Sequence, residues 1–88
     1  MLIRSQNKEV LVAFESLPDI EVSGGVISAR RNIGWCCLLG EYYTKEKAMK
    51  VLDMIQKRYE EYETERIYKE GVFKIGTFQM PEDSEVES

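Results

Sequence analysis

Histidine is absent from this chain of 88 residues. Its absence removes imidazole acid–base chemistry, the Ser-His and Cys-His nucleophile pairs, and the side chain that proteins most often use to bind a metal. The sequence therefore predicts no catalytic residue, no metal site and no cofactor. An enzyme, such as a nucleotide hydrolase that uses Glu or Lys, is the least favoured of the three functions considered below.

Cysteine is scarce, and the two cysteines, Cys36 and Cys37, are adjacent. A disulfide between neighbours is strained, and neither has another partner within the chain. We therefore expect free thiols in a reduced, cytoplasmic protein. No apolar run approaches membrane-spanning length, and the opening segment turns polar after Ile3, so we expect neither a membrane partner nor a signal peptide.

Excess charge of one sign is confined to residues 82–88, which carry four acids and no base. Of the 16 acidic residues in the whole chain, 12 remain outside this segment, equal to the 12 Lys and Arg residues. A protein without net positive charge is a poor candidate for binding nucleic acid. The pattern predicts one domain over residues 1–81, followed by an acidic disordered tail over residues 82–88.

One long amphipathic helix is predicted from Lys45 to about Thr64, with an end that the sequence leaves open as far as Gly71. Thr44 is a suitable N-cap. Steps of three and four residues place the apolar side chains on one face, because an α-helix has 3.6 residues per turn. These side chains belong to Ala48, Val51, Leu52, Ile55, Tyr59 and Tyr62. The tyrosines are expected either to close this core face or to line a pocket.

Short apolar runs separated by turn residues predict strands on both sides of the helix. Gly24 and Gly25 indicate a hairpin, and Gly76 indicates a β-bulge in a last strand over 72–80. The remaining strands are expected near 2–5, 10–14, 20–22, 26–30 and 35–39. The predicted fold is α+β: an antiparallel meander sheet of about four to five strands, one helix on one face, and a C-terminal strand. The uncovered sheet face predicts a homo-oligomer.

The candidate ligand-binding residues form an arginine–aromatic cluster: Arg30, Arg31, Trp35, Tyr42 and Tyr43. Guanidinium groups bind phosphate in a bidentate manner, and aromatic rings stack on bases. This combination predicts a site for a small anionic, nucleotide-like ligand between subunits. The alternative is a solvated turn, with Trp35 and Tyr42 in the core.

A second candidate surface is acidic. Glu60, Glu61, Glu63 and Glu65 lie at the end of the predicted helix, and Glu82–Glu87 form the tail. Together they suggest a protein–protein inhibitor that engages a basic surface on its target, with strong salt dependence. The alternative is a solvated helix end.

Three segments of the chain resemble small, largely uncharacterised proteins of phages and prophages of Gram-positive bacteria. These segments are Met1–Gln6 (MLIRSQ), Leu39–Ile55 (LGEYYTKEKAMKVLDMI) and Phe78–Asp83 (FQMPED). The resemblance implies an accessory phage protein in the cytoplasm of the bacterial host cell. It also implies a role against host defence, either by sequestering a nucleotide signal or by blocking a defence protein. The favoured interpretation is a non-enzymatic ligand-binding module, with the protein–protein inhibitor as the alternative.

Overall fold

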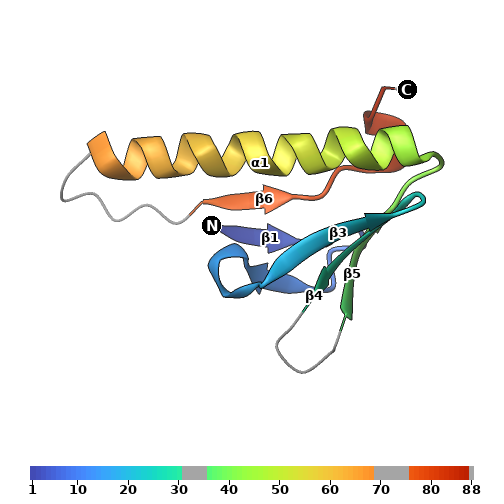
Figure 1. Cartoon of the computed structure of the whole chain (residues 1–88), viewed down its shortest axis with the longest axis horizontal. Coiled ribbons are helices and arrows are strands. Elements are labelled where there is room, and N and C mark those ends of the chain that lie inside the picture. Colours follow the sequence, from blue (N-terminus) through green and yellow to red (C-terminus); the bar gives the residue numbers. More distant parts are fainter. Residues whose placement is uncertain (31–35, 69–75, 88) are drawn as a thin grey trace.

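The computed structural model describes residues 1–30, 36–68 and 76–87. Within these ranges the protein is α+β, as predicted, with one long helix and two three-stranded sheets (Figure 1). The strands are β1 (Leu2–Arg4), β2 (Leu11–Ala13), β3 (Asp19–Ser23), β4 (Val26–Arg30), β5 (Cys36–Glu41) and β6 (Thr77–Gln79). The long helix is α1 (Lys45–Tyr68), and two short 3-10 helices are η1 (Phe14–Ser16) and η2 (Asp83–Glu85).

The prediction of a single sheet with about four to five strands is wrong. The strands form two sheets with the orders β2-β1-β6 and β3-β4-β5. The chain leaves the first sheet at η1, and Pro18 follows with a fixed φ and no N–H to continue a strand ladder. Only the second sheet is an antiparallel meander, because β1 pairs with β6 in parallel.

The first sheet joins two distant parts of the chain. Ile3 lies opposite Val12 of β2 in antiparallel register and opposite Phe78 of β6 in parallel register. Ile3 is 0% exposed, so the inward face of the central strand lies fully within the core. The predicted strand over 72–80 is observed as β6 at Thr77–Gln79, and residues 72–75 lie outside the described residues.

The second sheet begins with the predicted two-residue hairpin. Ser23 pairs with Val26, and Gly24 occupies the turn with a φ of 60°. A Cβ at Gly25 would clash with the backbone carbonyl of Tyr42, which explains why glycine occurs there. The pairing of β4 with β5 then shifts by one residue between Ile27 and Ser28, which marks a β-bulge.

Helix α1 lies across both sheets (Figure 1). It begins at Lys45, and the Lys47 N–H donates to Thr44 Oγ1 at 3.2 Å, which confirms the predicted cap. Its buried face consists of Ala48, Val51 and Ile55, which are 0–1% exposed. This face contacts β3 and β4, while farther along the helix Tyr62 lies against Gly76, just before β6.

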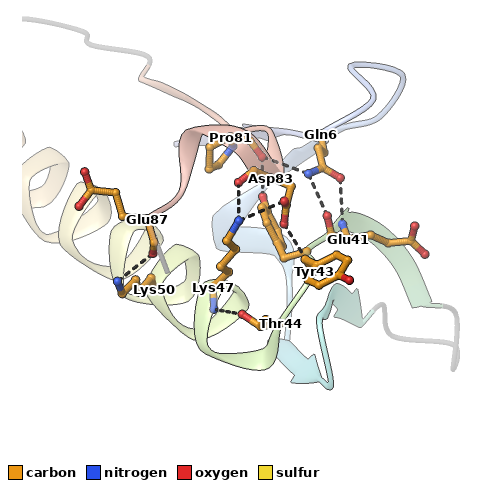
Figure 2. Close-up of polar contacts among 10 residues, drawn as sticks. Gln6, Glu41, Tyr43, Thr44, Lys47, Lys50, Pro81, Asp83 and Glu87 are labelled. Carbon is orange, nitrogen blue, oxygen red and sulfur yellow. Dashed lines mark hydrogen bonds and ion pairs between the residues drawn. The ribbon is translucent and has the colours of Figure 1, made fainter.

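Residues 82–87, predicted as a disordered tail, are folded onto the start of the helix in the structure (Figure 2). Val86 is only 6% exposed and belongs to the hydrophobic core. Asp83 accepts from the Tyr43 N–H at 2.6 Å and pairs with Lys47 Nζ at 3.1 Å. The Lys50 ammonium donates to the Glu87 carbonyl at 2.8 Å. An acidic composition predicts solvation, but here the Asp83 carboxylate has a donor on the helix, Lys47, and Val86 lies in the core.

The apolar sheet face that motivated the expectation of a homo-oligomer is small in the described part of the chain. On the two sheets, the exposed large hydrophobic side chains among these residues are Leu11 and Leu38, at 56% and 50%. They lie on different sheets, β2 and β5. The homo-oligomer therefore stays a prediction, without an extended apolar face among the described residues to motivate it.

Truncating Ile3 tests the central position of β1. We expect Ile3→Ala to lower the free energy of unfolding by about 2–5 kcal/mol, because it leaves a cavity between three strands. Leu11→Ala on neighbouring β2 removes an exposed side chain and should change stability by about 0.5 kcal/mol or less. Urea denaturation followed by circular dichroism measures both. If the free energy of unfolding fell equally in the two variants, the assignment of Ile3 to the core would be contradicted.

The pH dependence of stability tests the contact between Asp83 and the helix. The hydrogen bond from the Tyr43 N–H, followed by that from Lys47, holds the pKa of Asp83 below its ordinary value. Stabilisation from this lowered pKa is present above the unfolded-state pKa and is lost as pH falls through the folded-state pKa. We therefore expect Asp83→Asn to lower Tm at neutral pH, with a difference that shrinks in acid.

The matched control for this test is Asp53→Asn, which removes an exposed carboxylate from the same helix. Its difference in Tm from the wild-type protein should vary much less between neutral and acidic pH. A constant difference for Asp83→Asn at all pH values would show that the ionised Asp83 contributes nothing to the fold.

Candidate functional site

The predicted arginine–aromatic cluster is not gathered at one place by the described residues. Arg30 pairs with Cys36 at one end of the β4–β5 hairpin, whereas Val26 pairs with Glu41 at the other. Tyr42 and Tyr43 follow Glu41, so at about 3.3 Å per residue they lie on the order of 15 Å from Arg30. Arg31 and Trp35 are outside the described residues.

The guanidinium of Arg30 is engaged by carboxylates. Its Nη2 lies 3.0 Å from Glu21 Oε2, and its Nε lies 3.8 Å from Asp19 Oδ1, both on the adjacent strand β3. All three side chains are about half exposed, so these pairs are screened and weak. They nevertheless offset the positive charge that a phosphate ligand would need.

Tyr42 and Tyr43 occupy different environments. Tyr42 is 7% exposed, and its hydroxyl donates to the Pro81 carbonyl at 2.7 Å. Burial, followed by the charges of nearby carboxylates, raises the pKa of Tyr42, so its hydroxyl remains protonated at neutral pH. Tyr43 is 89% exposed. Tyr42 thus occupies the core, as the alternative interpretation expected, while Tyr43 is accessible to a partner.

A groove of about 500 Å³ lies between helix α1 and the segment that leads into β3. One wall is formed by η1, the Leu17-Pro18 segment and the start of β3, and the other wall is formed by the flank of α1. We refer to it as the α1–β3 groove. Its lining residues are Phe14, Leu17, Pro18, Asp19, Ile20, Leu52, Ile55, Gln56, Tyr59 and Glu60.

Aromatic packing fixes one end of this groove. The rings of Phe14 and Tyr59 are 4.4 Å apart between centroids, and Tyr59 also lies 6.2 Å from Tyr62. These contacts tie η1 to the helix and leave Leu17, Ile20 and Leu52 half-buried. A half-buried apolar side chain can still lose water-accessible area to a ligand, so this wall can bind a further apolar group.

The polar lining residues of the groove are acidic or neutral. Asp19 comes from the β3 side and Glu60 from the helix side, and both are exposed. The Gln56 side-chain amide donates to Glu60 Oε1 at 3.1 Å, one helical turn away. With two carboxylates among its lining residues, the groove favours a neutral or cationic group and disfavours a phosphate.

The sequence anticipated part of this groove. Tyr59 was expected to close the core face or to line a pocket, and it does both, since it packs on Phe14 and lines the groove. The wall from Leu17 to Ile20 was missed, because the strand-breaking Pro18 indicates only a turn. One signal was available: Leu52 lies at the edge of the apolar helix face and therefore turns toward a lateral neighbour.

No group of three or more Cys, Asp or Glu side chains in the described ranges is arranged to hold a metal ion. No helix of the described part is long and apolar enough to cross a membrane. Comparison with known protein families, curated proteins and solved structures finds no match to this chain.

Nucleotide binding by the arginine–aromatic cluster stays a prediction, and native mass spectrometry of protein purified from cells tests it. This prediction requires wild-type protein to carry the added mass of a nucleotide and the Arg30→Ala/Arg31→Ala variant to lose it, because phosphate recognition needs guanidinium. Lys45→Ala/Lys57→Ala removes the same charge from exposed helix positions and should retain the ligand. A wild-type protein without added mass would count against this prediction.

Proposed function

We propose that this chain is a non-enzymatic binding protein whose α1–β3 groove holds an apolar side chain from a basic segment of a partner protein. The observation that carries the proposal is a groove with an apolar floor and two exposed carboxylates, Asp19 and Glu60, among its lining residues. Apolar contact supplies affinity, and the carboxylates select for basic residues beside the anchor.

A protein partner fits this groove better than a nucleotide does. Phosphates would face Asp19 and Glu60 without a cation among the residues that line the groove. A segment of alternating apolar and basic residues meets both features of the site. The acidic helix positions Glu60 and Glu61 are exposed and lie at and beyond the edge of the groove, with Lys57 beside them. They would speed association with a basic partner at low ionic strength.

The free energy of burying one apolar side chain is too small to account for stable binding. Burying one large apolar side chain contributes about 1.5–3 kcal/mol. Micromolar affinity corresponds to about 8 kcal/mol, so a single side chain in the groove is too weak. The partner must therefore make further contacts along the surface next to the groove. An extended segment is the simplest way to supply them.

The resemblance to phage proteins suggests the source of the partner. We propose a protein of the bacterial host, whose own interaction would be blocked while its basic segment occupies the groove. The acidic helix end is part of this proposal. Residues 82–87, in contrast, are folded against the start of α1, where Lys47 pairs with the Asp83 carboxylate and Lys50 donates to the backbone carbonyl of Glu87. The C-terminal segment is therefore assigned a structural role in this proposal.

Blocking the groove tests the proposal. Gln56 is exposed at the groove wall, and Gln56→Trp places a large ring over the floor without truncating a core side chain. The probe is a fluorescently labelled peptide of alternating lysine and valine, and anisotropy measures its affinity. We expect Gln56→Trp to weaken binding about tenfold, which corresponds to about 1.4 kcal/mol.

The matched control is Met54→Trp, which puts the same ring on an exposed position of the same helix, away from the groove. It should bind the lysine–valine peptide like the wild-type protein. A peptide of alternating glutamate and valine should bind neither variant nor the wild-type protein. Equal affinities of the two tryptophan variants for the lysine–valine peptide would overturn the assignment of the groove.

A further inference from the structure

We propose that the partner segment binds as an added β-strand along the free edge of β3. This inference rests on the proposed function and states how the segment reaches the groove. In this mode the main-chain hydrogen bonds of the added strand supply affinity, and alternate side chains enter adjacent pockets. Strand addition would supply the contacts that the partner needs in addition to one side chain in the groove.

Strand β3 has an open side. It is an edge strand, hydrogen-bonded to β4 on one side, and its register with β4 runs over all five residues from Asp19 to Ser23. Among the described residues, no backbone group outside its own sheet is hydrogen-bonded to this strand. An edge strand presents unpaired N–H and C=O groups, which form a template for another chain.

The groove lies at the same side of the strand. Asp19 and Ile20 contribute to its lining, but no residue of β4 does, although Ala29 of β4 is the register partner of Ile20. The opposite wall is the flank of α1 at Leu52 and Gln56. A strand added at the usual spacing of about 4.8 Å from β3 would direct its inward side chains toward this flank.

The alternation of β3 specifies the partner sequence. Asp19 and Glu21 are exposed on the outer face, where both pair with Arg30 of β4, so the three side chains together keep one net negative charge. Ile20 and Val22 are half-buried on the inner face. Opposite charges on neighbouring strands attract, and like charges repel. The added strand should therefore carry basic residues on its outer face and apolar residues on its inner face. The net negative charge that remains beside Arg30 disfavours pairing with an acidic strand, and hence also with a second copy of β3.

Backbone methylation of the probe peptide tests strand addition. In a β-strand, side chains alternate between faces while N–H groups alternate between edges, both with a period of two residues. In the lysine–valine peptide, all valine N–H groups therefore point to one edge and all lysine N–H groups to the other. One peptide is N-methylated at every valine and a second at every lysine.

We expect one methylated peptide to bind about tenfold more weakly than the other, because only one set of N–H groups faces β3. The set that is sensitive also reports the direction of the added strand, since the valine side chains are fixed toward the groove. As a second readout, hydrogen exchange of amides in β3 should slow when the unmodified peptide is added.

The outcomes separate this inference from the proposed function. Strand addition is overturned if both methylated peptides bind as tightly as the unmodified one, or if methylation lowers the affinity of both equally. If Gln56→Trp still blocks binding in that case, the groove assignment survives. Unchanged hydrogen exchange in β3 on peptide binding would overturn strand addition in the same way. If the unmodified peptide does not bind wild-type protein, both proposals fail.

Discussion

The structure depends on one helix that has to cover the inner faces of two separate sheets. Helix α1 presents Ala48, Val51 and Ile55 to a common core, and these side chains are almost completely buried. Farther along the helix Tyr62 lies against Gly76, just before β6 of the first sheet, and the helix contacts β3 and β4 of the second sheet. Because one helix is narrow relative to two sheets, coverage stops at its flanks, and the α1–β3 groove lies where it stops.

The local elements of this fold were predictable because each has a signal within a few residues. The Thr44 cap, the 3.6-residue periodicity of α1 and the Gly24-Gly25 turn all appear at the expected places. The division into two sheets was not predictable in this way. It depends on β6 pairing with β1 in parallel, across more than 70 positions, and short strands carry no signal for a distant partner.

The candidate site was also only partly predictable, because it depends on contacts between distant segments. The neighbouring residues Arg30 and Arg31 suggest a ligand site, but Tyr42 follows the end of β5 that lies far from Arg30. The groove is assembled from η1 and the start of β3, which are neighbours in the sequence, and from the flank of α1, which is distant from both. Only Tyr59 was anticipated there, because an aromatic residue near the edge of an apolar helix face has a limited set of neighbours. The sequence alone does not indicate that Asp19 and Glu60 line the same groove, because this depends on how β3 packs beside α1.

The parallel pairing of β1 with β6 also affects how the chain folds during synthesis. The β1–β2 hairpin, the second sheet and most of α1 are built from residues that precede Thr77. Until residues 77–79 leave the ribosome, the first sheet has only two short strands, and an isolated two-stranded hairpin is marginally stable at best. Closure of the core around Ile3 therefore waits until β6 has been synthesised.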